Sequence, residues 1–91
     1  MTCRIDRLVT REGLAILRIS GGITGEDVAM LRALLEQERS RVALDLKDVL
    51  LVDREAVKLL AFHESNGAEL RSCSSYIREW VTRERNGTAA K

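Results

Sequence analysis

The sequence predicts a small α/β domain, a mixed sheet of about four strands with helices packed on it. Three observations lead to this class. Short aliphatic segments typical of strands alternate with amphipathic helical segments along most of the chain. The first two strand-like segments follow each other directly, which favours an antiparallel hairpin ahead of parallel strands. The chain has only one Phe, one Tyr and one Trp, so an aliphatic core is expected.

The hairpin is predicted from two apolar segments near the start of the chain. They cover residues 3–10 and 14–19, and a polar break that contains Gly13 separates them. After the second segment come Gly21 and Gly22, and because glycine tolerates positive φ angles, we expect the strand to end there in a sharp turn.

An amphipathic helix is predicted next, from Thr24 to about Arg39. Thr24 is a good N-cap residue, and the acidic residues that follow it suit the first turn of a helix. Apolar side chains then recur at helical spacing, namely Val28, Leu31, Leu34 and Leu35. This face is expected to pack on the sheet.

The central strand and the second helix form the next predicted unit. Residues 42–46 are aliphatic and suit a strand covered on both faces. Residues 47–52 are expected to form a loop at its end, and Asp53 to cap a helix over residues 54–65. Asn-Gly at its end, with Gly67 in the left-handed region, is a common helix exit.

A fourth strand and a third helix complete the predicted domain. The strand covers residues 68–73, and a helix capped by the following serines carries Ile77, Trp80 and Val81 on one face. Beyond them no apolar period is visible. We therefore expect a domain over residues 1–84 and a disordered tail over residues 85–91.

The composition limits the possible functions. The formal net charge is +1 with both signs interspersed, which argues against nucleic-acid binding. No apolar run approaches the roughly 20 residues of a membrane span, and no signal sequence is visible, so a cytoplasmic protein without membrane insertion is expected. Cys3 and Cys73 lie far apart without a metal-binding pattern, so we expect two small buried thiols in preference to a disulfide or a reactive site, and no cofactor.

Several residues permit a chemical and a structural interpretation. Asp45, Asp48 and Asp53 could hold Mg²⁺, but Asp53 also suits a helix cap, which is favoured. The glycine pair before Thr24 could bind an anion, although a turn is favoured. A hydrolase using Asp48, Asp53 and His63 is the least supported reading, because no nucleophile accompanies them in sequence.

Three segments carry a family likeness. Residues 17–24 (Leu-Arg-Ile-Ser-Gly-Gly-Ile-Thr), residues 42–53 (Val-Ala-Leu-Asp-Leu-Lys-Asp-Val-Leu-Leu-Val-Asp) and residues 66–70 (Asn-Gly-Ala-Glu-Leu), in this order and spacing, resemble the STAS domain of bacterial anti-sigma factor antagonists. The likeness covers most of residues 3–84. It implies a small α/β domain that works by binding, and not an enzyme.

The resemblance also implies a site at the start of the second helix. In the antagonists, a serine just after the aspartate that opens this helix is phosphorylated by an anti-sigma kinase, which docks on the same surface. Asp53 matches the aspartate, but the phosphoacceptor position is occupied by Arg54 and the next position by Glu55. Neither side chain accepts a phosphoryl group, so the usual serine switch is absent from this position.

We therefore expect a non-catalytic protein-interaction module. The resemblance implies an anti-sigma factor, a kinase-like regulator or another STAS protein as the partner. The expected contact residues are Gly21, Gly22, Thr24, Asp48, Asp53, Arg54, Glu55 and Lys58. The alternatives are a homo-oligomeric scaffold, such as a homodimer, and an accessory subunit of a transporter. Many family members continue with a further strand and helix, so an uncovered sheet edge or core face is expected here.

Overall fold

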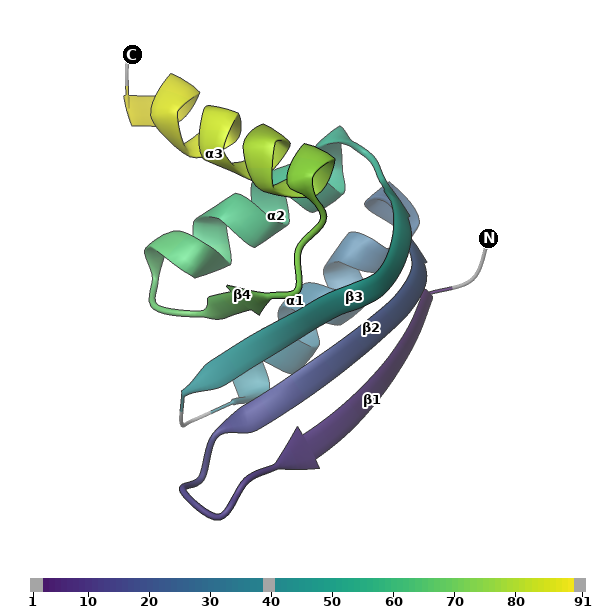
Figure 1. Ribbon diagram of the computed structural model, residues 1–91, viewed down its shortest axis with the longest axis vertical. Helices are drawn as coiled ribbons and strands as arrows, with labels where there is room; N and C mark the ends of the chain where they lie inside the picture. The colour runs from purple at the N-terminus through teal and green to yellow at the C-terminus, as the bar shows by residue number, and fades with distance from the viewer. Residues whose placement is uncertain (1–2, 39–40, 90–91) are drawn as a thin grey trace.

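A four-stranded sheet and three helices make up the chain in the computed structural model, which describes residues 3–38 and 41–89 (Figure 1). The predicted α/β class and the order of the elements are confirmed. Along the chain the elements are β1 (Cys3–Val9), β2 (Ala15–Ile23), α1 (Gly25–Gln37), β3 (Val42–Val52), α2 (Arg54–Ser65), β4 (Glu69–Arg71) and α3 (Ser75–Ala89).

The sheet is mixed, as the sequence predicts. Its strand order is β1-β2-β3-β4, with β1 antiparallel to β2 and the other neighbours parallel. The two crossovers, β2-α1-β3 and β3-α2-β4, step in the same direction across the sheet, so right-handed connections put α1 and α2 on the same face. Figure 1 shows α1 behind the sheet, and α3 packs on α2 at the edge of this layer.

The core lies between that face of the sheet and the helices. Its strand side chains include Leu17, Ile19, Leu44 and Leu46, all of which are fully buried. The helices contribute buried stripes that contain Val28, Leu31, Leu35, Ala56, Val57, Leu59, Leu60, Ala61, Ile77 and Val81. Because side chains alternate along a strand, every second residue of the sheet points to the opposite face, which α1 and α2 do not cover. We call this the open face.

The strand β2 does not end before Gly21, and the predicted sharp turn is wrong. Gly21 and Gly22 remain in the strand, where Gly21 is in register with Cys3 of β1 and Val49 of β3. Strands on both sides supply partners for the backbone, which keeps the chain extended. Gly21 has a φ angle of 88°, and a register shift follows it, so glycine here permits a bulge in place of a turn.

The strand β3 is also longer than predicted, and the expected loop over residues 47–52 is absent. These residues continue the strand to Val52 because the extended β2 lies alongside them, with Ile23 in register with Val52. The pairing of β2 with β3 contains register shifts, and such irregularities bend a strand and increase its twist. The strand β3 is therefore bent and strongly twisted toward its carboxyl end.

The strand β4 is shorter than predicted. It covers only Glu69–Arg71, opposite residues 43–45 of β3, and Ser72 ends it with a φ angle of 55°. The predicted exit from α2 is confirmed, since Gly67 has a φ angle of 104°.

The helix α3 reaches Ala89, whereas the sequence predicts an unstructured tail from residue 85. Two ion pairs accompany this extension. Arg83 lies 2.6 Å from Glu79 one turn earlier, and Arg85 lies 2.9 Å from Glu64 of α2. The second pair joins separate helices, so no local pattern reveals it. Residues 39 and 40, close to the predicted end of the first helix, and residues 90 and 91 of the predicted tail lie outside the described residues.

Candidate functional site

The two helices α1 and α2 begin side by side at the carboxyl ends of β2 and β3, and Asp53 joins them. One carboxylate oxygen, Oδ1, accepts the backbone N–H of Ala56 at 2.9 Å, as expected for the N-cap of α2. The other, Oδ2, accepts the N–H of Gly25, the first residue of α1, at 2.7 Å. The Asp53 N–H in turn donates to the carbonyl oxygen of Ile23 at 3.2 Å.

Thr24 is part of a second local network at the start of α1. The carboxylate of Asp27 accepts the Thr24 backbone N–H at 2.9 Å and the Thr24 hydroxyl at 3.2 Å. This is the return contact of a capping box, in which the third helical residue reaches back to the cap. The polar groups of Thr24 thus hold the helix start, and this side chain is only half-exposed.

The first turns of α2 present charged side chains to solvent. Arg54, Glu55 and Lys58 are all exposed, whereas Ala56 and Val57 between them are buried in the core. Because Arg54 and Lys58 are four residues apart on a helix, they lie on one side of it. The outer side of the helix start therefore carries both signs of charge.

The other predicted contact residues lie in the neighbouring strands β2 and β3. Asp48 is exposed, but it is on the open face of β3, in register with Ser20. Gly21 is half-exposed and Gly22 is buried within the sheet. The structure thus groups Asp53, Arg54, Glu55 and Lys58, and places Thr24 beside them, directly before Gly25, whose N–H binds Asp53. Gly22 lies in the adjacent strand, in register with Leu51, and Gly21 lies one residue further back.

Two exposed apolar residues directly before the start of α2 were not predicted as contact residues from the sequence. Leu50 and Leu51, at the end of β3, are 71% and 46% exposed. The signal was present in the sequence, because residues 49–52 are four apolar residues in a row. A strand with one covered face can bury only about half of such a run.

The aspartates proposed for Mg²⁺ do not form a cluster. Asp45 lies on the open face with its carboxylate 3.6 Å from the Arg18 guanidinium, while Asp53 is occupied by two backbone N–H groups. Among residues 3–38 and 41–89, no group of three or more His, Cys, Asp or Glu side chains could hold a metal ion.

His63 is also separated from the aspartates. It lies in the last turn of α2, ten residues after Asp53 and thus about 15 Å along the helix. Burial lowers the pKa of its imidazole, and the ring meets Phe62 edge-on at a centroid distance of 5.2 Å. In the described part of the chain its Nε2 atom is buried without a hydrogen-bond partner. The combination of Asp48, Asp53 and His63 is therefore not assembled into a catalytic site.

An open cavity of about 660 Å³ lies beside His63, at the opposite end of the sheet from Asp53. Its wall includes Glu38, Arg41 and Asn66. The helices α1 and α2 end here, so their exposed carbonyl groups disfavour an anion.

The two thiols are free, but each is only half-buried, whereas the sequence predicts buried thiols. Burial raises the pKa of Cys3 and of Cys73 above the ordinary value of a thiol. A raised pKa leaves little thiolate at neutral pH, which makes both groups poor nucleophiles.

Solved structures share this arrangement of elements. The anti-sigma factor antagonist SpoIIAA in its unphosphorylated form matches with a TM-score of 0.66 and 17% identity, over 90% of this chain and 83% of that chain. An antisigma-factor antagonist STAS domain from Rhodobacter sphaeroides matches with a TM-score of 0.58 and 19% identity, over 80% and 92% of the two chains.

A third structure is an uncharacterized protein of the DUF3478 family, with a SpoIIAA-like fold, from Shewanella loihica. It has a TM-score of 0.56 and 19% identity, and the match covers 94% of this chain and 78% of that one. No family model matches the sequence, and no curated protein matches it.

The chain therefore has the fold that STAS domains and SpoIIAA share. The resemblance seen in the sequence is confirmed at the level of the fold. In the described residues, none of the helices combines the length and apolar character that crossing a bilayer requires.

Proposed function

We propose that this protein is a non-catalytic protein-interaction module of a bacterial regulatory system, acting in the cytoplasm. Its partner would be an anti-sigma factor, a kinase-like regulator or another STAS protein. The proposal is supported by the shared fold of two anti-sigma factor antagonists and by the surface at the start of α2. We call this surface, made of Leu50, Leu51, Arg54, Glu55 and Lys58, the helix-start surface.

The observation that carries the proposal is the double hydrogen bond of Asp53. By binding the N–H groups of Gly25 and Ala56 at 2.7 and 2.9 Å, this carboxylate fixes the starts of both helices relative to each other. The neighbouring residue, Arg54, is thereby presented from a rigid turn. A preorganised surface loses less conformational entropy on binding, which favours affinity.

The chemistry of the helix-start surface suits a protein partner. Leu50 offers an exposed apolar side chain, which can be buried at the centre of an interface. Arg54, Glu55 and Lys58 follow it at the start of α2 and carry both signs of charge, which can set orientation and partner choice.

The surface has no serine switch. Between Asp53 and Lys58 the sequence is Arg-Glu-Ala-Val, without a hydroxyl to phosphorylate. The proposed interaction is therefore constitutive, since charge at this position is fixed by Arg54 and Glu55.

The test compares three purified forms as baits in a native lysate, followed by mass spectrometry and titration of the captured protein. They are the wild type, the charge exchange Arg54→Glu/Glu55→Arg, and Leu50→Asp. A matched control is Glu79→Arg/Arg83→Glu, which exchanges an exposed ion pair on α3.

We expect the wild type and the control to capture the same regulator, and both site variants to lose it by about tenfold or more in affinity, the size of one lost interfacial anchor. Equal capture by all forms would overturn the assignment of the helix-start surface. Capture of a metabolic enzyme alone would contradict the regulatory role.

A further inference from the structure

The open face of the sheet carries a row of charges of alternating sign. Asp6 of β1 is in register with Arg18 of β2, Arg18 with Asp45 of β3, and Asp45 with Arg71 of β4. These residues form one line across all four strands, which we call the charge row. Their neighbours in sequence, such as Leu17 and Leu44, point into the core, which places the charge row on the opposite side.

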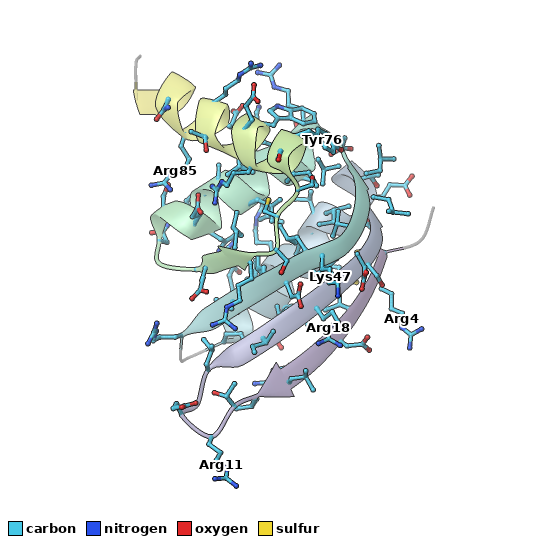
Figure 2. All side chains as sticks on the ribbon, viewed as in Figure 1. Arg4, Arg11, Arg18, Lys47, Tyr76 and Arg85 are labelled. Carbon is cyan, nitrogen blue, oxygen red and sulfur yellow. The ribbon has the colours of Figure 1, made fainter. Side chains whose placement is uncertain are left out.

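The charge row is accessible. The side chains of Asp6 and Arg18 are 57% and 53% exposed, that of Arg71 is 40% exposed and that of Asp45 is 20% exposed. Figure 2 shows Arg18 and Lys47 in front of the sheet, on the side away from α1. The face is thus free to meet another surface.

A second row runs parallel to the charge row and is mostly apolar. Leu8 is in register with Ile16, Ile16 with Ala43, and Ala43 with Glu69. Leu8 is 49% exposed. Ala43 itself is fully buried, so Leu8 and Ile16 are the apolar side chains that this row presents beside the charge row.

The charges of this face balance. Its basic side chains are Arg4, Arg18, Lys47 and Arg71, and its acidic side chains are Asp6, Asp45, Asp48 and Glu69. A partner of one predominant charge would meet as much repulsion as attraction. A surface with the same alternating pattern in reverse order would meet attraction at every position of the charge row.

A second copy of this chain supplies that reversed pattern. The signs of the charge row are antisymmetric about the line between β2 and β3. A two-fold axis along this line, parallel to the strands, sets Arg18 opposite Asp45 of the second copy, and Asp6 opposite Arg71 of the second copy. In the second row it sets Ile16 opposite the buried Ala43, and Leu8 opposite Glu69. A two-fold axis along the row itself would oppose like charges, which excludes it.

We propose that two copies of this protein associate face to face through the open face, about a two-fold axis that lies between β2 and β3. Such an interface is isologous, with the same patch on both subunits. The charge row shares no residue with the helix-start surface, and the proposed dimer does not depend on the proposed function. Pairing through the sheet edge is less favourable because β4, at one edge, has only three residues, two of them charged.

The size of the face predicts a weak dimer. Strands about 4.8 Å apart and residues about 3.3 Å apart give roughly 14 by 23 Å for β1 to β3, and the three residues of β4 add a strip of roughly 5 by 10 Å. Two such faces bury on the order of 800 Å² in total, which is the size of a weak, transient contact. We expect a dissociation constant of roughly 10–100 μM, weakened by salt because the charge row is partly exposed.

The test uses the full chain in sedimentation equilibrium from about 10 μM to 1 mM, a range that brackets the expected constant. Arg18→Asp and Asp45→Arg each oppose like charges across the interface, and each variant alone should lose about tenfold or more in dimer affinity. Mixed in equal amounts, the two variants restore both opposite-charge contacts and should form a heterodimer.

The mixture distinguishes contacts between two chains from ion pairs of the charge row within one chain. In each variant, residues 18 and 45 of the same chain carry like charges, and mixing does not change this. The mixture therefore regains dimer affinity only if residue 18 of one chain contacts residue 45 of the other. Glu79→Arg/Arg83→Glu serves as the control that leaves the dimer unchanged, and circular dichroism checks the fold. A wild type that is monomeric at 1 mM, a dimer that Arg18→Asp does not weaken, or a mixture that stays monomeric would each overturn the proposal.

Discussion

The carboxylate of Asp53 stabilises two helices with one side chain. It accepts the N–H of Ala56 at 2.9 Å and that of Gly25 at 2.7 Å. We predict that Asp53→Ala lowers the free energy of unfolding by about 2 kcal/mol, since an N-cap and a second charge-assisted hydrogen bond are lost together. Asp53→Asn keeps one acceptor oxygen and should lose about half as much. Urea denaturation measures both.

The control for this prediction is Asp48→Ala, which removes an exposed aspartate from the same strand end. It should change the free energy of unfolding by less than about 0.5 kcal/mol. If Asp53→Ala were no less stable than this control, the joint capping by Asp53 would be refuted.

Glu64 makes the stability of the fold depend on pH. Arg78 donates two hydrogen bonds to its carboxylate at 2.8 and 2.6 Å, and Arg85 donates a third at 2.9 Å. The hydrogen bonds from Arg78, together with that from Arg85, lower the pKa of Glu64. A carboxyl group with a lowered pKa in the folded state stabilises the fold above its unfolded pKa, near 4.3, and loses this effect as the pH falls through the folded pKa.

We therefore predict that the wild type is more stable than Glu64→Gln by about 1 kcal/mol at pH 7, and that this difference shrinks as the pH falls below about 4.3. Urea denaturation at a series of pH values measures it. Glu55→Gln removes an exposed carboxylate from the same helix and serves as the control. A difference that persists undiminished at pH 2 would contradict the ionic origin of the effect.

At the scale of the elements, the long β2 and β3 decide where the candidate site lies. Because β2 continues through its glycine pair to Ile23, β3 can continue beside it to Val52. This extension carries Leu50 and Leu51 to the start of α2, where they join the charged residues of the helix-start surface. A loop in this segment would not have held Leu50 and Leu51 at a fixed position relative to the charged residues of α2.

The helix α3 is part of the core and not an appendage. Ile77 is fully buried, while its neighbour Tyr76 is 50% exposed. We predict that Ile77→Ala costs about 2–4 kcal/mol because it leaves a cavity between α3 and the rest of the core, whereas Tyr76→Ala costs less than about 1 kcal/mol. Denaturant unfolding of both variants measures the contrast. Similar losses for the two neighbours would contradict the docking of α3 on the core.

At the scale of the whole molecule, one-sided layering leaves two separate surfaces. All strand-to-strand crossovers place α1 and α2 on one face, so the other face is open (Figure 1). The helix-start surface lies at the carboxyl end of the strands, and the charge row crosses the middle of the open face. The two proposed contacts, one with a regulator and one with a second copy, therefore use different residues.

The sequence by itself determined the class of the fold, the order of its elements and the starts of its helices. These features depend on local signals, such as the helical spacing of Val28, Leu31 and Leu35 or the N-cap at Asp53, which act over one or two turns. The position of Arg54 directly after Asp53 also followed from the sequence. Arg54, Glu55 and Lys58 of the helix-start surface were therefore named from the sequence, whereas Leu50 and Leu51 were not.

Only the tertiary structure decided the rest. Whether Gly21 turns or stays in a strand depends on β1 and β3 at its two sides, and whether α3 continues to Ala89 depends in part on Glu64 of another helix. The charge row exists only through the register of four strands. Pairing between distant segments supplies these hydrogen bonds and contacts, and no local pattern contains the information that sets it.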